Sequence, residues 1–331
     1  MSFLRMNSLL VVVFVVVLAM SLCFGQHVFP PSQWIKALIS PEKDVLDLIF
    51  TEFRLPRTLA AALIGGSLAL AGTVTQSVLR NPISEPGILG ASSGCNSAIT
   101  LAMMFQFHQS ANLWLVPSLG VLGGMILVLT VVTIALKRGL ASANSLVLVG
   151  IAISSAVTAL TLILSLSIDR TTYSHAVAWM AGSIGRANWT YVAVLLGSAL
   201  FTFGSFFAQS HTLDIAQLQD EASIGLGLRP IASRLCMLLL ASFVESLTTA
   251  LVGAFPFVGI VAPNIGRLLT SGVHSRLIVV SPLIGAILVI TADLIGRTMF
   301  GPYEVPAGMI MAVLGGGFFL RLLVKSPTYR S

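Results

Sequence analysis

Residues 55–79 of this 331-residue chain read LPRTLAAALIGGSLALAGTVTQSVL and carry one charged side chain, Arg57. A helix needs about 20 mostly apolar residues to cross the ~30 Å hydrocarbon layer of a bilayer. This stretch is long enough, and the block RNPISEPG at 80–87 follows it with two prolines that stop a helix. The segment therefore predicts a membrane-spanning helix.

Similar apolar stretches recur along the whole chain. Hydrophobic residues make up 56% of the sequence and charged residues 9%, whereas an average soluble domain is about a quarter charged. Such a composition cannot cover a surface that faces water, so lipid is the expected solvent. We predict an all-α, polytopic protein of the cell inner membrane, a single transmembrane domain over residues 1–331 with about ten spans.

Apolar windows bounded by charges, prolines and glycines give the predicted spans. These windows are 8–25, 55–79, 88–107, 114–136, 144–167, 190–208, 234–253, 257–270, 277–297 and 305–324. The first window also resembles a secretion signal, but no A-x-A-like cleavage site follows it, and it is interpreted as a retained span. Window 257–270 is too short to cross alone, at about 21 Å of helix, and is expected to be a partial span shielded by protein.

Basic residues suggest an orientation with both termini in the cytoplasm. This arrangement places 11 of the 18 Lys and Arg residues inside, a modest bias in the direction of the positive-inside rule. The net charge of +6 is scattered over the span ends. No basic stripe accompanies it, so a nucleic-acid partner is not expected.

Two polar segments are long enough to have a function of their own. Residues 26–53 are expected to form an outer loop with a short amphipathic piece. Residues 209–233 are expected inside, as a short helix, a glycine-marked turn and a second short helix. Connections in helical bundles are usually shorter than this, which favours a docking surface over a mere link.

Motifs at both ends of segment 55–79 allow a purely structural and a functional interpretation. Arg54 and Arg57 lie on one helix face, either as snorkelling interfacial side chains or as paired donors to a carboxylate. The block at 80–87 is either a tight turn, in which Asn81 ties down the local backbone, or a gate at the inner mouth of a path.

Ionisable residues inside spans point to function, because a charge at the bilayer centre costs at least ~2.5–3.5 kcal/mol. Glu245 is the most central of them and either lines a path or is hydrogen-bonded across helices. Asp293 and Arg297, four residues apart, are expected to pair, with Asp293 orienting Arg297.

The sequence predicts no catalytic or metal site. Residues 90–94 match the nucleophile pattern G-x-S-x-G around Ser92, but they open an apolar helix, where small residues serve close packing. Cys23, Cys95 and Cys236 lack paired spacing. No phosphate-binding G-x-x-x-x-G-K-[ST] pattern occurs, so no cofactor is expected in this chain, and any ATP is bound by a partner.

From Arg54 to about Leu323, the motifs in order resemble the FecCD family of permeases. They are RLPR at 54–57, Gly72, Gln76, RNPISEPGILGASSG at 80–94, LVGIAIS at 148–154, Trp179, Gly182-Ser183, EASIGLG at 221–227, FVGIVAPNIGR at 257–267, Ala292-Asp293, Arg297 and EVPAG at 304–308. The resemblance implies a permease of an ABC importer for ferric siderophores, haem or cobalamin, with ten spans. Its implied partners are a second permease subunit, in a homodimer or heterodimer, two ATP-binding subunits and a substrate-binding protein.

The resemblance also assigns roles to particular residues. Arg54, Arg57 and Arg297 match the outer arginines that meet carboxylates of the binding protein. The matches to the inner gates are Asn81, Ile83, Ala143 and Asn144. The matches to the ATPase-coupling segment are Asp220, Glu221, Ala222, Gly225 and Gly227.

Several residues depart from the family pattern: Ala143-Asn144 at the second gate, Pro256, Asn264 and Gly316-Gly317. By family frequency the expected cargo is an iron chelate, a ferric siderophore first, with haem or cobalamin as alternatives. A proton-coupled secondary transporter built on Glu245 is the alternative from another class, although no inverted repeat is visible. An intramembrane serine hydrolase using Ser92 is a third interpretation.

Overall fold

The computed structural model describes residues 3–25, 28–39, 44–105, 107, 113–137, 143–218, 220–226, 230–300 and 303–325. Every regular element within these residues is helical. In chain order they are α1 (Phe3–Cys23), α2 (Pro31–Ile39), α3 (Val45–Leu48), the π-helix η1 (Ile49–Arg54), α4 (Leu55–Val78), the 3-10 helix η2 (Pro86–Leu89), α5 (Ala91–Met104), α6 (Leu115–Lys137), α7 (Ala143–Ser165), α8 (Arg170–Met180), α9 (Trp189–Ala208), α10 (Ser210–Ala216), α11 (Asp220–Gly225), α12 (Pro230–Val252), α13 (Val258–Thr270), α14 (His274–Thr298) and α15 (Ala307–Lys325).

The helices agree with the predicted all-α membrane architecture. Seven of them are long and apolar enough to cross a membrane, and each falls in one of the ten predicted windows. The other three windows hold α5, α13 and α15. The all-helical class is thereby confirmed, whereas the count of ten spans and the sides of the termini stay predictions.

Two details differ from the expected boundaries. The predicted span 88–107 holds a helix of only 14 residues, α5, because Pro86 starts the separate turn η2 and Gly90 adopts the left-handed conformation with φ +99°. The helix α8 was not predicted, since its sequence RTTYSHAVAWM has no long apolar run. Its start is fixed instead by Asp169, whose carboxylate accepts a hydrogen bond of 3.0 Å from the backbone N–H of Thr172.

The polar segments also match their predicted character in outline. Residues 26–53 contain the short helix α2 and the start of the continuous helical stretch that becomes α4. Residues 209–233 contain the two short helices α10 and α11, and α11 ends at Gly225. The order differs from the expected one, because both short helices come before Gly227, which lies with residues 228 and 229 outside the described residues, and the next described helix is α12.

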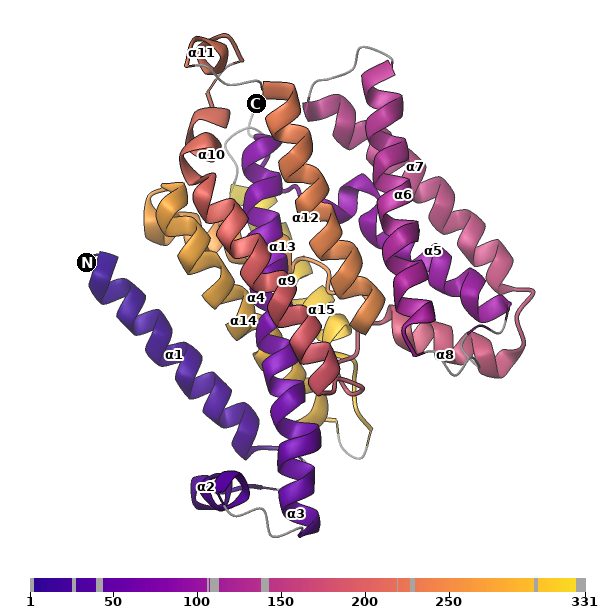
Figure 1. The fold of residues 1–331 in the computed structure, drawn as a ribbon, viewed down its shortest axis with the longest axis vertical. Coiled ribbons are helices and arrows are strands. Elements are labelled where there is room, and N and C mark those ends of the chain that lie inside the picture. Colours follow the sequence, from indigo (N-terminus) through magenta and orange to yellow (C-terminus); the bar gives the residue numbers. More distant parts are fainter. Residues whose placement is uncertain are drawn as a thin grey trace.

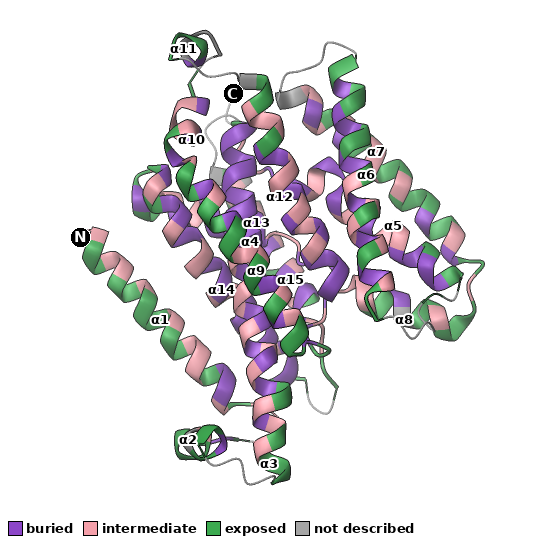
Figure 2. Ribbon diagram, in the orientation of Figure 1, coloured by how far each residue is buried: buried purple, intermediate pink, exposed green. Residues whose placement is uncertain are grey.

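Helix α4 is the central element of the fold (Figure 1), and its middle is buried over several turns (Figure 2). It contacts its neighbours backbone to backbone. A Cβ atom at Gly65 would lie 2.1 Å from the carbonyl oxygen of Gly285 on α14, and one at Gly72 would lie 2.0 Å from that of Gly259 on α13. Small residues are what allow helices to approach this closely in a membrane protein.

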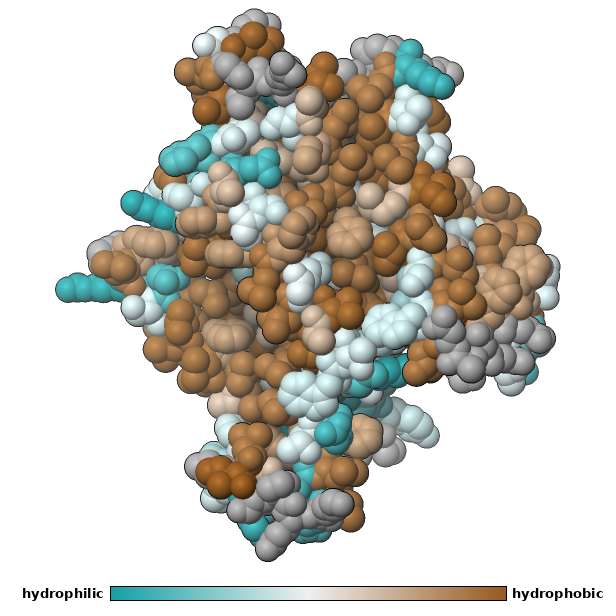
Figure 3. Space-filling view, in the orientation of Figure 1, coloured by the Kyte–Doolittle hydropathy of each residue, from teal (hydrophilic) through white to brown (hydrophobic). Residues whose placement is uncertain are grey.

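The remaining elements surround this centre. Helices α5 to α8 form a group on one side, α1 crosses the opposite side diagonally, and α2 with α3 and α10 with α11 lie at opposite ends (Figure 1). One buried cluster joins α4 to α6 and α12 through Val74, Val128 and Leu238. Figure 3 shows that apolar side chains cover most of the visible face between the two ends, as a lipid-facing belt requires.

The close approach of α4 and α14 leads to a stability prediction. Gly65→Ala places a methyl group against a backbone carbonyl that cannot rotate away, and overpacking of this kind costs about 1–3 kcal/mol. Gly197→Ala on α9 is the matched control, since a Cβ there meets nothing within 4 Å. We expect the detergent-solubilised Gly65→Ala protein to lose its monodisperse state at a clearly lower temperature than the control. Equal melting of the two variants would contradict the contact.

Candidate functional site

An arginine cluster lies at the end of α4 where that helix begins. Arg54 is buried and its Nη1 donates hydrogen bonds of 3.0 Å to the carbonyl oxygens of both Leu22 and Cys23, the last residues of α1. Its guanidinium group also lies over the Phe29 ring, 4.5 Å from the centroid. This side chain therefore caps α1, whose terminal carbonyls have no partners within the helix.

Arg297 approaches the same helix end from α14. Its Nη2 donates to the carbonyl oxygen of Ser21 at 2.5 Å and to the Ser21 hydroxyl at 2.7 Å. The expected pairing with Asp293 is present but long, at 3.4 Å from Nε. The nearer partner of Asp293 is Arg57, so the expectation that Asp293 serves mainly to orient Arg297 was incomplete.

Arg57 makes the strongest ion pairs of the cluster. Its Nε and Nη2 both donate to Asp293, at 3.0 Å and 2.9 Å, in the forked geometry that favours guanidinium groups. Its Nη1 donates to Glu304 at 2.9 Å. The Asp293 side chain is only 1% exposed, whereas that of Glu304 is 41% exposed.

These three arginines, for which the sequence predicted a shared role, line one cavity. The cavity has a volume of about 320 Å³ and opens among Gly25, Ile49, Phe53, Arg54, Arg57, Gly185, Arg297 and Glu304. Sequence reasoning missed the contribution of α1 and of Glu304. No short-range signal marks those contacts, since Arg297 and Ser21 are 276 residues apart.

The block 80–87 forms a tight, hydrogen-bonded turn at the other end of α4. The Asn81 side-chain oxygen accepts a bond of 3.1 Å from the N–H of Ile83, which is the local tie that the sequence predicted. From α13, Asn264 donates to the Pro82 carbonyl at 2.8 Å. The family-atypical Asn264 thus holds the turn against α13.

The other predicted site residues are described less completely. Ala143 and Asn144 begin α7, and Asp220, Glu221 and Ala222 lie in α11, but only their helical backbone is described. Gly225 ends α11, and a Cβ there would meet nothing within 4 Å. Gly227 lies outside the described residues.

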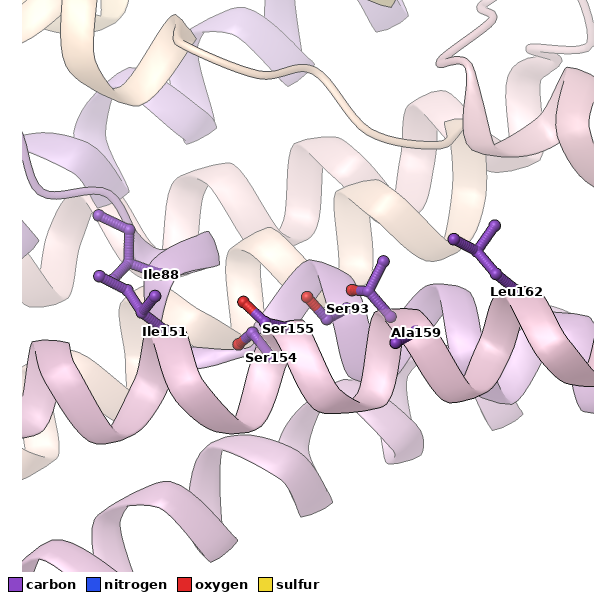
Figure 4. Close-up of a pocket in the computed structure, with 8 residues that line it drawn as sticks. Ile88, Ser93, Ile151, Ser154, Ser155, Ala159 and Leu162 are labelled. Carbon is purple, nitrogen blue, oxygen red and sulfur yellow. The ribbon is translucent and has the colours of Figure 1, made fainter.

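A groove of about 520 Å³ runs along α7 and was not predicted. Figure 4 shows hydroxyl-bearing Ser93, Ser154 and Ser155 in its middle, with Ile88 and Ile151 toward one end and Leu162 toward the other. The signal that marks it is the sequence SSAVT at 154–158, a run of hydroxyls within an otherwise apolar helix. The groove combines hydroxyl groups with apolar walls, a lining that suits a large neutral or weakly polar ligand.

Glu245 is hydrogen-bonded across helices, one of the two interpretations its sequence position allowed. The Ser92 hydroxyl donates to its carboxylate oxygen Oε1 at 2.6 Å. The Ser92 hydroxyl proton is therefore directed to α12, and among the described residues its acceptor is a carboxylate and not a histidine base. Within the described residues no group of three or more His, Cys, Asp or Glu side chains is placed to hold a metal ion.

Comparison with known proteins places this arrangement in a class of membrane transport proteins. Residues 12–325 match the FecCD transport family, and the chain belongs to that family. The resemblance found in the sequence is thus confirmed, and the protein is a multi-pass membrane protein.

Relatives match over nearly their full lengths. The iron-uptake system permease protein FeuC of Bacillus subtilis is 36% identical over 96% of both chains. The iron(3+)-hydroxamate import system permease protein FhuG of the same species is 32% identical over 94% of both. The hemin transport system permease protein HmuU of Yersinia pestis is 32% identical over 87% of this chain and 86% of that protein.

A solved structure has the same fold. It is an inward-facing conformation of a metal-chelate type ABC transporter, with a TM-score of 0.85, 26% identity, and coverage of 98% of this chain and all of that one. The fold of PsaBC from Streptococcus pneumoniae is also similar, with a TM-score of 0.58 over 90% of this chain.

Capping of α1 by Arg54 leads to a second prediction. Arg54→Gln loses one of the two bonds to the Leu22 and Cys23 carbonyls and all of the cationic contact with Phe29. We expect the end of α1 to open more often, so that Cys23 reacts several-fold faster with a maleimide in a Cys95→Ala, Cys236→Ala background. Arg170→Gln serves as the matched control, since Arg170 lies on α8 and contacts neither Leu22 nor Cys23. Unchanged Cys23 reactivity would show that Arg54 does not hold α1.

Proposed function

We propose that this chain is the permease subunit of a binding-protein-dependent ABC importer that moves a ferric siderophore across the inner membrane. The observation that carries the proposal is the match of the whole chain to permeases whose names specify iron and iron-hydroxamate uptake. Energy comes from ATP bound and hydrolysed by partner subunits, because this chain has no phosphate-binding motif. The chain itself is not an enzyme.

The proposed arrangement in the membrane has ten spans with both termini in the cytoplasm. This places the arginine cluster at the outer face and the turn 80–87 with α10 and α11 at the inner face. Opposite placement of these groups follows from α4, since a 24-residue helix is about 36 Å long and one group lies at each of its ends. Residues 209–233 then dock on the ATPases.

A second permease subunit is proposed to cover the open groove of α7. The α7 window is only 17% buried, although hydroxyl groups line part of its exposed face. A Cβ at Gly316 or Gly317 on α15 would meet nothing within 4 Å, so a partner backbone can approach there as well. Two such grooves facing each other form a path for an iron chelate, with Asn81, Ile83, Ala143 and Asn144 at its inner gates.

The binding protein is proposed to dock over the outer arginine cluster. Arg54 and Arg297 already serve α1, and Arg57 already pairs with Asp293 and Glu304. A carboxylate of the binding protein therefore has to compete with Glu304, the exposed member of the cluster, for one side of Arg57. Because one carboxylate replaces the other, Arg57 stays paired throughout, and the binding protein can dissociate without leaving Arg57 unpaired.

Reconstitution tests the proposed function. The complex of permease, ATPases and binding protein in liposomes should take up a ferric siderophore only when ATP is present on the side of the membrane that carries the ATPases. Haem and cobalamin, offered in parallel, test the alternative cargoes, of which haem has a named relative. Glu245→Gln should keep most uptake, because an amide still accepts the Ser92 bond. Uptake driven by a proton gradient without ATP, and lost in Glu245→Gln, would overturn the proposal in favour of a secondary transporter.

Charge reversal at Arg57 tests the docking surface. Arg57→Glu should weaken binding-protein affinity by tenfold or more at low salt, because the loss of one partner of a desolvated charge pair costs ~2–5 kcal/mol. The measurement is a titration of the liposome-reconstituted complex with labelled binding protein at two salt concentrations. A Glu→Arg change on the binding protein should restore part of the affinity, which a merely misfolded permease cannot allow. If Arg57→Glu and Arg297→Glu both leave the affinity for the binding protein unchanged, the arginines only hold helices of this chain together and the docking proposal is wrong.

A further inference from the structure

A chain of polar contacts joins α10, in the inner segment, to the end of α4. Asp214 on α10 accepts two hydrogen bonds from His274, the first residue of α14: one from ring atom Nδ1 at 2.6 Å and one from the backbone N–H at 3.2 Å. A ring nitrogen that faces a carboxylate carries the proton. His274 is fully buried, so this contact fixes how α10 sits on α14.

The other ring nitrogen of His274 reaches α4. Nε2 lies 2.6 Å from the Ser77 hydroxyl oxygen and 3.3 Å from the side-chain nitrogen of Gln217, within hydrogen-bond distance of both. Ser77 is in the last turn of α4, directly before the turn 80–87. One imidazole thus bridges the inner segment and the central helix.

Serine, histidine and aspartate in this order also resemble a hydrolase triad, but the surroundings rule out that chemistry. An acyl-transfer site needs backbone N–H groups free to stabilise an oxyanion. The N–H groups of Leu79, Arg80 and Asn81, which follow Ser77, all donate within the chain. The Ser77 hydroxyl is itself 2.7 Å from the carbonyl oxygen of Thr73. The contacts among Ser77, His274 and Asp214, called the relay below, therefore hold α4, α14 and α10 together.

A second contact ties the turn to the same short helix. Arg80 donates from Nε to the Ala216 carbonyl at 3.0 Å and from Nη2 to the Leu218 carbonyl, at the carboxyl end of α10. Its backbone has φ +50°, a left-handed conformation that is uncommon for a residue with a side chain. The surrounding contacts hold this conformation at the point where α4 ends and the turn begins.

Open space beside these residues leaves room for rearrangement. A cavity of about 210 Å³ is lined by Gln76, Ser77, Arg80, Asn81, Pro82, Gln217 and Arg267. The Arg80 side chain can therefore change partners without displacing packed atoms. Two residues after Arg80, the turn is held by the bond from Asn264 to the Pro82 carbonyl, so a displacement of Arg80 acts on a turn that is anchored at Pro82.

We propose that Asp214, His274 and Arg80 are positioning residues that transmit movement of segment 209–233 to the turn 80–87. The inference rests on the proposed function, since it needs an ATPase that moves that segment. When α10 shifts, the Asp214–His274–Ser77 relay carries the shift to the last turn of α4, and Arg80 carries it to the first residue of the turn. The two contacts act in parallel on adjacent residues.

The test uses the reconstituted complex and measures the number of siderophore molecules moved per ATP hydrolysed. The variants are Arg80→Lys, whose single ammonium group cannot span two carbonyls as the guanidinium fork does, and His274→Leu, which removes both ring contacts. His274→Gln keeps one donor and one acceptor and is the conservative partner. Arg276→Gln is the matched control, since Arg276 lies two residues further along α14 and faces the Phe3 ring. A second readout is the maleimide reactivity of Ile83→Cys in a background without other cysteines, with and without ATP.

We expect Arg80→Lys and His274→Leu to lower the transport-to-hydrolysis ratio tenfold or more and to make Ile83→Cys reactivity independent of ATP. His274→Gln should recover part of the ratio, and Arg276→Gln should behave as wild type. If His274→Leu does not fold, Arg80→Lys decides the question, because the Arg80 side chain lies at the exposed edge of the contact. A wild-type ratio and wild-type ATP response in Arg80→Lys would overturn the proposal. Absence of ATP-dependent uptake in the wild-type complex would instead overturn the proposed function.

Discussion

The fold depends on direct contact between the backbone of α4 and those of α13 and α14. Gly65 meets Gly285, and Gly72, seven residues further along α4, meets Gly259. Both contacts therefore lie on one face of α4, two turns apart, or about 10 Å. Three helices held at such short range form a unit with little freedom to bend or slide. The arginine cluster lies at one end of α4 and the turn 80–87 follows the other, about 36 Å away along the helix.

Burial of charge explains how the ends of that unit are stabilised. A lone ion within the apolar region is costly, and each buried charge of the arginine cluster has a partner suited to it. Arg57 takes the forked pair with the nearly inaccessible Asp293, while Arg54 and Arg297 neutralise part of the negative end of the α1 dipole. As a result, α1, of whose span only 11% is buried, is fastened at its carboxyl end by polar bonds.

Sequence alone predicted the helices better than the contacts between them. Each of the ten apolar windows holds a helix, because lipid selects for apolar side chains. The windows misplaced the start of α5, which depends on the left-handed Gly90. They also missed α8, whose capping residue Asp169 is a local signal within a polar sequence. The motif and the predicted topology grouped Arg54, Arg57 and Arg297, and in the structure these arginines line one cavity. Their bonds to α1, the pairing of His274 with Asp214, and the role of Asn264 were beyond reach, because these partners are 31 to 276 residues apart.

The rigidity of the central unit constrains how the groove along α7 can change width. Helices α5 to α8 form a group on one side of the molecule (Figure 1) that packs on the centre through α6 and α12, and the chain enters this group through the turn 80–87 and η2. A Cβ at Gly150 on α7 would lie only 2.5 Å from the Ile88 carbonyl oxygen, so η2 and α7 are in backbone contact. Ile88 and Ile151 both line the groove. Under the proposed coupling, displacement of the turn therefore reaches α7 and the groove through backbone contact, without an intervening side chain.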